Sequence, residues 1–94
     1  MSAMEWLNYH HLLYFWMVDR EGGLAPAGKV LRLSQSALSG QIRQLEGSLG
    51  QSLFERRGRG IVLTEFGRYF ATKATAILEH VDSVIADTKR WPTS

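Results

Sequence analysis

One stretch near the middle of the chain decides the fold: Ser34-Gln35-Ser36-Ala37-Leu38-Ser39-Gly40-Gln41-Ile42-Arg43-Gln44-Leu45-Glu46. It predicts a helix over about Gln35 to Leu49. Ser34 is the expected N-cap, because a serine hydroxyl at that position accepts from a free amide of the first turn. Leu38, Ile42 and Leu45 follow one another at i, i+4 and i+7, which places them on one helix face. We therefore expect these three side chains to face a hydrophobic core.

The opposite side of this helix carries small and polar side chains. At 100° per residue, Ser36, Gly40 and Arg43 lie there, flanked by Ser39 and Gln44. Small side chains let a helix backbone approach a partner closely. This face is therefore the first candidate for a binding surface.

A helix is predicted upstream from about Asn8, its N-cap, to Arg20, and the glycines that follow end it. Its expected core face consists of four residues at i, i+3, i+4 and i+7, with Val18 on the border of that face: Leu12, Phe15, Trp16 and Asp19.

A short second helix is expected from about Pro26 to Leu33, with proline at the first helical position, where it is tolerated. Ala27, Val30 and Leu31 form its expected buried side. Gly28 lowers helix propensity by about 1 kcal/mol relative to alanine, so we expect it to serve a close helix–helix contact.

The chain changes character after Gly50. Two short strand-like pieces, at 52–55 and 60–63, surround Arg56-Arg57-Gly58-Arg59. Glycine between two short runs rich in apolar residues is typical of a turn, so this part predicts a small β-hairpin with a basic tip.

The last segment predicts one long helix from Thr64, its N-cap, to about Arg90. Apolar and small residues recur in steps of four and three, which is the spacing of a two-helix seam: Phe70, Ala74, Ile77, Val81, Val84 and Thr88. At 1.5 Å per residue the helix is about 40 Å long, too long to be covered by so small a body. We expect a second helix to cover the stripe; the alternative is that the stripe folds back on its own domain.

The charge is unevenly distributed along the chain. The 94 residues carry a formal charge of +2, but residues 29–73 hold eight basic and three acidic side chains, or +5. The flanks hold three basic and six acidic side chains, or −3. A basic middle favours a surface that binds a polyanion.

Other classes of protein are disfavoured by composition. There is no cysteine for disulfides or thiolate metal sites. The longest apolar run, Leu12 to Val18, has seven residues, against the ~20 of a membrane-spanning helix. The N-terminus lacks the order of regions typical of a secretory signal. We expect a single soluble, cytoplasmic domain that makes no contact with a membrane.

Three helices followed by a basic hairpin form a winged helix-turn-helix, in a mainly α fold, and this arrangement predicts binding to double-stranded DNA. The helix 35–49 would enter a major groove about 12 Å wide, where glutamines such as Gln35 and Gln44 read adenine and Arg43 reads guanine or a phosphate. Amides capped by Ser34 suit a phosphate. The hairpin tip, residues 56–60, would reach the minor groove or clamp phosphates through its guanidinium groups: Arg56, Arg57 and Arg59.

The residues that carry this arrangement resemble a known family. The stretch 34–46, then Leu49-Gly50, Leu53-Phe54-Glu55-Arg56 and Leu63-Thr64-Glu65-Phe66-Gly67, are similar to the N-terminal domain of LysR-type transcriptional regulators. The resemblance covers about residues 8–90. Within the family, three motifs are most similar to the branch that regulates sodium/proton antiporter genes: Tyr14-Phe15-Trp16, Ser39-Gly40-Gln41-Ile42 and Arg57-Gly58-Arg59-Gly60.

The resemblance implies a homodimer joined through antiparallel long helices, with two dimers forming a tetramer in a full-length protein, and an inverted-repeat promoter site on the bacterial nucleoid. It divides the chain into a winged helix-turn-helix at 1–63, a linker helix at 64–90 and a tail at 91–94 that leads to an effector domain. The family's base-reading residues fall on Gln35, Ser36, Ser39 and Gly40, with the wing arginine on Arg59.

Three positions depart from the family's pattern. Proline usually stands where Ser36 is, and arginine where Gly40 is, so Arg43 or the wing would carry more of the binding here. The second helix usually begins with a serine or threonine cap, whereas this chain has Gly23-Leu24-Ala25-Pro26. Pro26 would offset the missing cap by fixing φ.

Several alternatives stay open at this point. The three wing arginines could be an ordinary solvated turn, and Arg43 could simply pair with Glu46 or Glu55. The chain could be a protein-interaction module that uses only its long helix, or it could bind RNA.

An enzyme is not expected, because the sequence has no carboxylate pair in an apolar setting and no phosphate-cradling loop. A metal site is not expected either, because the adjacent His10 and His11 diverge by about 100° on a helix and neither has an acidic residue at i+4. We therefore predict no catalytic residue, no metal and no cofactor.

Overall fold

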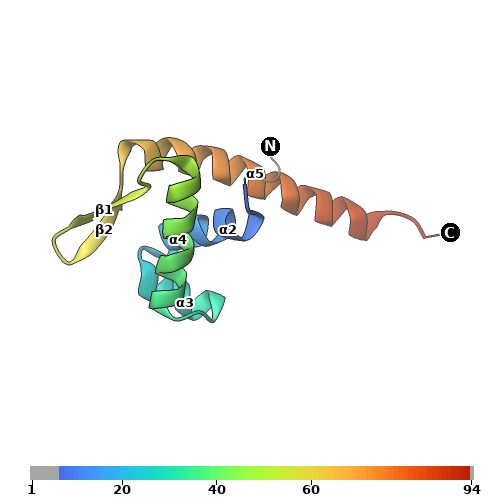
Figure 1. Cartoon of the computed structure of the whole chain (residues 1–94). Coiled ribbons are helices and arrows are strands. Elements are labelled where there is room, and N and C mark those ends of the chain that lie inside the picture. The colour runs from blue at the N-terminus through green and yellow to red at the C-terminus, as the bar shows by residue number, and fades with distance from the viewer. Residues whose placement is uncertain (1–6, 94) are drawn as a thin grey trace.

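The computed structural model describes residues 7–93. Its elements, in chain order, are α2 (Tyr9–Glu21), α3 (Leu24–Leu31), α4 (Gln35–Leu49), β1 (Phe54–Arg57), β2 (Gly60–Leu63) and α5 (Glu65–Arg90). Helices α2, α3 and α4 form one body, the β1–β2 hairpin projects from one side of it, and α5 runs across it and away on the other side (Figure 1). Among residues 7–93, no helix combines the length and apolarity that crossing a bilayer requires. The fold is the expected winged helix-turn-helix with a long C-terminal helix.

The hydrophobic core lies where α2, α4, the start of β1 and the first half of α5 meet. Phe15 is completely buried at its centre, with its ring 5.4 Å from the rings of both Phe54 and Phe70. The three leucine and isoleucine side chains predicted to face inward from α4 are all buried there: Leu38, Ile42 and Leu45. The predicted orientation of α4 is therefore confirmed.

The first helix, α2, begins as predicted. The Asn8 side chain accepts hydrogen bonds from the amides of His10 and His11, and Gly22 ends the helix with a left-handed φ of 82°. The predicted core face is wrong in one member, because Asp19 is exposed to solvent and Val18 is buried in its place. The body covers the i, i+3, i+6 side of α2, which spares the charged residue from desolvation.

The start of α3 differs from the expectation, because the helix begins at Leu24 and not at Pro26. Pro26 is the third helical residue, where the missing N–H has no cost because the first four amides of a helix lack an intrahelical acceptor. Val30 was expected to be buried, but it is 55% exposed. Ala27 and the backbone of Gly28 form the buried side instead.

Gly28 serves a close contact, although not with another helix. A Cβ at this position would lie 2.6 Å from the Leu33 carbonyl oxygen, in the turn that leads from α3 into α4. The Leu33 amide also donates to the Gly28 carbonyl at 2.9 Å. The absence of a side chain at Gly28 therefore keeps this turn tight.

The hairpin is shifted relative to the sequence prediction, because β1 begins at Phe54 and not at Ser52. The Glu46 carboxylate accepts hydrogen bonds from the amides of Leu53 (2.7 Å) and Phe54 (3.4 Å), and the Leu53 side chain is buried. These contacts hold residue 53 against α4 and delay the strand. Arg56 and Arg57 consequently belong to β1, and only residues 58 and 59 form the turn.

Helix α5 begins at the predicted cap. The Thr64 hydroxyl accepts from the Gly67 amide at 2.9 Å and donates to the Ser52 carbonyl at 2.7 Å. A Cβ at Gly67 would collide with the Leu53 carbonyl oxygen, so glycine lets the first turn of α5 lie directly on the chain before β1.

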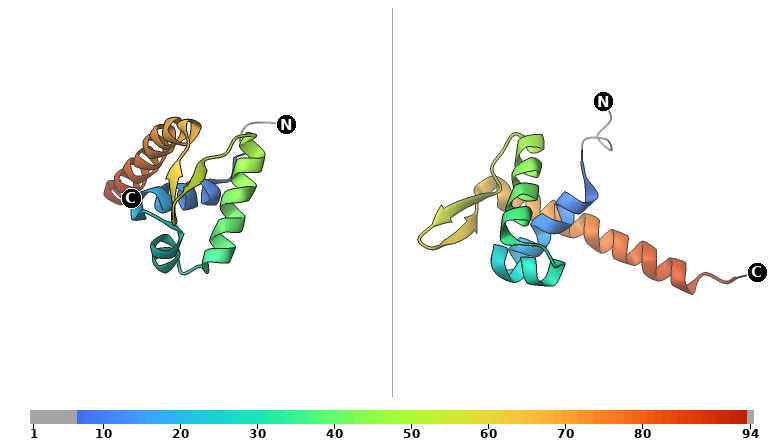
Figure 2. Two further views of the ribbon diagram at one scale, coloured as in Figure 1. Left: turned by 90° about the vertical axis from the view of Figure 1, so that its left-hand side faces the viewer. Right: turned by 60° about the horizontal axis from the view of Figure 1, so that its bottom comes forward.

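The predicted seam on α5 is divided between two environments. Ala74 is fully buried within its own chain and Phe70 packs on the core, so the prediction that Ala74 meets a partner is wrong. Ile77 and Val84 are 42% and 50% exposed, and Val81 is half-buried. Two causes divide the stripe. The body covers the side of α5 that carries Ala74 and Leu78 and leaves Ile77 exposed, and the last part of α5 extends past the body altogether (Figure 2).

Candidate nucleic-acid interface

The outer face of α4 lies as the sequence predicts. The Ser34 hydroxyl accepts from the Ala37 amide at 3.0 Å and so caps the helix. Gln35 and Ser36 in the first turn are exposed, while Ser39 and Gly40 are partly exposed. A Cβ built at Gly40 meets no atom within 4 Å, so this position is open space on the surface. The face is free to approach a partner closely.

Arg43 lies along this same face. Its Nη2 donates to the Ser39 hydroxyl at 3.1 Å, one turn earlier on α4. Arg43 does not form the alternative ion pair with Glu46 or Glu55. Glu46 accepts hydrogen bonds from backbone amides, and Glu55 pairs with Arg57 at 3.6 Å. The guanidinium of Arg43 is therefore held in place by a neutral hydroxyl and keeps its charge free for an anion.

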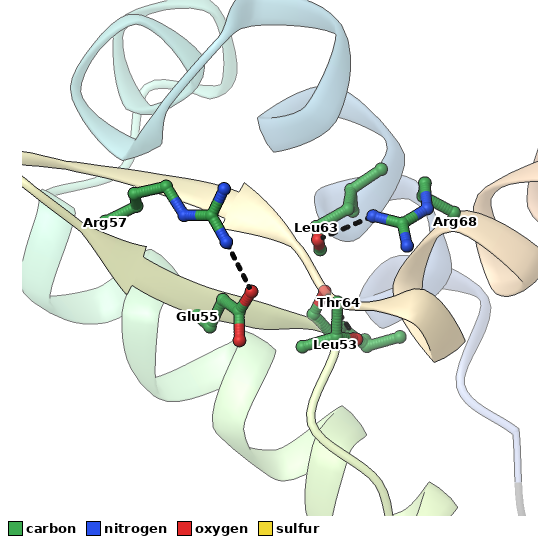
Figure 3. Close-up of polar contacts among 6 residues, drawn as sticks. All are labelled: Leu53, Glu55, Arg57, Leu63, Thr64 and Arg68. Atoms are coloured by element: carbon green, nitrogen blue, oxygen red, sulfur yellow. Dashed lines mark hydrogen bonds and ion pairs between the residues drawn. The ribbon is translucent and has the colours of Figure 1, made fainter.

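The pleat of the hairpin separates the two adjacent arginines of β1. In the antiparallel register Arg56 is opposite Ile61, and Arg57 is opposite Gly60. Successive side chains of a strand point to opposite faces, so Arg56 and Arg57 lie on different sides of the hairpin. Figure 3 shows Arg57 reaching Glu55, its neighbour on one side.

A hollow of about 500 Å³ lies between the hairpin and the helices, and it brings most of the predicted residues together. From α4 and the hairpin it is lined by Gln35, Ser36, Ser39, Arg43, Arg56, Arg59, Gly60 and Ile61. Every charged side chain in this lining is an arginine. The hollow is thus a basic, open surface with a helix face on one side and a hairpin on the other.

Four predicted residues do not line this hollow. Gln44 is exposed further along α4. Ser34 acts through its cap, Gly40 lies on the α4 surface beside the hollow, and Arg57 is on the outer face of the hairpin with Glu55. Of the three wing arginines, the structure therefore brings Arg56 and Arg59 to the helix face and leaves Arg57 apart.

The structure also adds residues that the sequence analysis did not assign to the interface. The turn before α3 and its first residues, Gly22 to Pro26, line the same hollow. The sequence marked this segment only by its lack of a capping side chain, and the structure shows no side-chain N-cap on α3. Arg68 lies at the base of the hairpin, where its Nη1 donates to the Leu63 carbonyl at 3.3 Å (Figure 3).

The two adjacent histidines of α2 do not line this hollow. Within residues 7–93, no three potential metal-ligating side chains gather. On the exposed start of α2, the centre of the His10 ring is 6.0 Å from that of Tyr9 and 6.1 Å from that of Tyr14.

Comparison with known proteins agrees with this geometry. Residues 9–68 match the family model described as the bacterial regulatory helix-turn-helix protein, lysR family. The chain is 41% identical over 86 residues to the transcriptional activator protein NhaR of Escherichia coli, covering 87% of this chain and 29% of NhaR. It is 39% identical over 88 residues to the HTH-type transcriptional regulator PcaQ of Agrobacterium fabrum, covering 89% of this chain and 28% of PcaQ. The chain thus spans less than a third of these relatives.

Solved structures give the same result. The chain superposes on the BenM DNA-binding domain in its catB site 1 DNA complex with a TM-score of 0.84 and 37% identity, covering 89% of this chain and 93% of that one. For the CbnR DNA-binding domain in its DNA complex, the TM-score is 0.77 and the identity 38%, covering 89% and 95%. Both are structures in which a domain of this shape is bound to DNA.

Proposed function

Because this chain belongs to the LysR family of bacterial regulatory helix-turn-helix proteins, we propose that it is the sequence-specific DNA-binding part of a transcriptional regulator. The observation that carries the proposal is the basic hollow, in which the outer face of α4 and the hairpin arginines come together. A helix with small side chains fits a major groove about 12 Å wide, and a hairpin with arginines fits the adjacent backbone or minor groove.

The proposal assigns base reading to four residues on the first turns of α4: Gln35, Ser36, Ser39 and Gly40. A glutamine amide bonds to adenine in two places, and a serine hydroxyl accepts or donates at either kind of base edge. Gly40 has no side chain and brings the α4 backbone close to the bases. Ser34 orients the amides at the start of α4 toward a phosphate.

Arg43 contributes a charge held by Ser39, at 3.1 Å, and reads a guanine or a phosphate. Because arginine is missing at position 40, Arg43 and the wing carry a larger share of the binding. Arg56 and Arg59 bind phosphates or the minor groove from the hairpin side. Arg57 is partly neutralised by Glu55 and contributes less.

The proposal further assigns residues 64–90 to a linker helix that pairs with a second copy, and residues 91–94 to the passage toward an effector domain. Support comes from the exposed apolar side chains on α5 from its middle onward, among them Ile77, Val84 and Ile85. Two-fold symmetry in the protein demands a matching inverted repeat in the DNA. A tetramer built from two such dimers, at work on the bacterial nucleoid, is the assembly we propose for the full-length regulator.

The decisive experiment compares three arginine variants on one duplex, which the wild-type chain has first selected from a random-sequence pool. Arg56→Ala and Arg59→Ala should each weaken binding about five- to tenfold at fixed salt, as expected from the loss of one charged contact. Each should also reduce the slope of log affinity against log salt by about one. Arg57→Ala is the matched control and should change both quantities less.

If Arg56→Ala and Arg59→Ala both leave duplex affinity unchanged, this face does not bind DNA, and the protein-interaction alternative gains. Competition with unlabelled RNA tests the alternative that the chain binds RNA. If the chain is a duplex DNA binder, RNA should displace the labelled duplex only weakly.

Gln35→Ala should relax the preference for one base pair and leave the slope of log affinity against log salt unchanged. The reason is that base contacts determine specificity, whereas phosphate contacts position the protein.

A further inference from the structure

Helix α5 is anchored to the body at two separate places. At its start, the Thr64 amide donates to the Leu53 carbonyl at 2.9 Å and the Thr64 hydroxyl donates to the Ser52 carbonyl at 2.7 Å. Three turns later, the indole Nε1 of Trp16 on α2 donates to the Thr75 hydroxyl at 3.2 Å. Eleven residues of helix separate Thr64 from Thr75, which corresponds to about 16 Å. Two anchors this far apart define the direction of a rod.

The second anchor is itself held in place. Trp16 is partly buried, and the guanidinium of Arg20, one turn further along α2, lies 4.7 Å from the centre of its ring. The ring face attracts the cation. The indole edge donates the hydrogen bond to Thr75, which is a directional contact that a purely apolar side chain could not make.

Beyond Leu78 the helix has little cover from the body. Only Val81 is partly buried there, and the remaining residues to Arg90 are exposed. Twelve residues extend about 18 Å past Leu78, so a tilt of about 10° would move the end of α5 by about 3 Å. That displacement is comparable to the ~3.4 Å rise of one base pair.

We propose that Trp16 is a positioning residue that sets the spacing between the two DNA half-sites by fixing the direction of α5 relative to α4. The inference rests on the proposed function, since spacing has meaning only for two copies paired through α5. Trp16 does not contact DNA in this proposal. It determines how far apart the two α4 helices lie once the α5 helices have paired.

The test separates positioning from general stability. The inverted repeat that the wild-type chain selects from a random pool is rebuilt with its spacer lengthened or shortened by one base pair, and a duplex with a single half-site is added. Trp16→Phe removes the donor and keeps an aromatic ring. Thr75→Val removes the acceptor and keeps the branched shape.

In both variants, the ratio of affinity for the selected spacer to affinity for the neighbouring spacers should fall about fivefold. A factor of this size corresponds to the net free energy that one hydrogen bond contributes. Affinity for the single half-site should stay within twofold, because α4 and the hairpin are untouched. The double variant should lose no more than either single one, as expected when both changes remove the same contact. Thr72→Val is the matched control on the same helix, because its hydroxyl donates only to the Arg68 carbonyl, and it should keep the preference.

Two results overturn the positioning role while the proposed function stands. In one, the wild-type chain shows a spacing preference and both variants retain it. In the other, the variants weaken on every duplex alike, in step with a lower Tm, which is the behaviour of a side chain that only supports the fold. A wild-type chain that binds half-sites with no spacing preference at all overturns the pairing through α5 and the role of Trp16 together.

Discussion

Arg32 has a backbone conformation that is unfavourable for a residue with a side chain. Within residues 7–93 it is the only non-glycine residue with a left-handed backbone, at φ 59°, and it ends α3. A Cβ is disfavoured in this conformation, which is why glycine is the usual residue just past a helix end. Here the tight contact between Gly28 and Leu33 imposes the conformation on the turn.

Replacing Arg32 should therefore stabilise the domain, provided that the new residue is glycine. Arg32→Gly should raise the free energy of unfolding by about 0.5–1 kcal/mol, because relief of the left-handed strain exceeds the entropy that glycine adds to the unfolded chain. Urea denaturation without DNA measures it. Arg32→Ala is the control, since it removes the same charge but keeps the Cβ, and it should give no gain. An equal gain in both variants would attribute the effect to charge.

At the scale of elements, the first turn of α5 lies directly on the chain before β1. This contact depends on Gly67, where a side chain would collide with the Leu53 carbonyl oxygen and press on a Leu63 methyl at 3.1 Å. The neighbouring Thr64 bonds to the same stretch. The base of the hairpin and the start of α5 therefore form one rigid corner.

Gly67→Ala should lower the free energy of unfolding by about 2–3 kcal/mol, because a methyl group forced into a packed backbone contact strains both segments. Thermal and urea unfolding followed by circular dichroism measure the change. Gly47→Ala is the matched control, because its Cβ would meet nothing within 4 Å and alanine is the better helix former, so it should add about 0.5–1 kcal/mol. A neutral Gly67→Ala would show that the corner can open at little cost.

The hairpin shows how the geometry of an element separates side chains that are adjacent in sequence. Its arginines look equivalent along the sequence, yet the pleat places Arg56 and Arg57 on opposite faces and the turn contains only Gly58 and Arg59. Gly58 has φ 62° at the first turn position, which favours the type of two-residue turn that suits the twist of paired strands. The wing therefore presents two arginines to the helix face and one to the outside.

At the scale of the whole molecule, the shape is that of a small body with a long arm. The chain extends 56 × 33 × 21 Å, and its longest dimension is set by α5, whose second half has no cover from the body (Figures 1 and 2). Val84 is half exposed on this arm, and Ile77 lies two turns earlier on the same side. Under the proposed function, the α5 helix of a second copy of the chain covers these exposed apolar side chains.

Val84→Lys should weaken self-association at least tenfold, because it places a charge among the exposed apolar side chains of the proposed seam, where pairing would desolvate it. Sedimentation equilibrium over a range of concentrations measures the constant. Ala86→Lys carries the same charge to the opposite side of α5 and should stay within twofold of the wild type. Equal association in all three proteins would contradict pairing through this stripe.

Local physics made much of the molecule predictable from sequence. The caps at Asn8, Ser34 and Thr64 are side chains bonding to amides two or three residues away, and α4 has the predicted bounds, with its three predicted core residues buried. Such contacts depend only on helix geometry and near neighbours. The basic character of the hairpin was equally visible, because charge is a property of the residues themselves.

What only the tertiary structure decided is what each face meets. Periodicity puts Phe70, Ala74, Ile77 and Val84 on one stripe, but packing decides which of them are covered. The body covers Phe70 and Ala74, faces Leu78 in place of Ile77, and does not extend as far as Val84. In the same way, Val30 is exposed because α3 turns Ala27 and Gly28 inward. The burial of a side chain depends on contacts with residues that are distant in sequence. The sequence pattern therefore predicts which side chains share a face, whereas the tertiary packing determines what that face contacts.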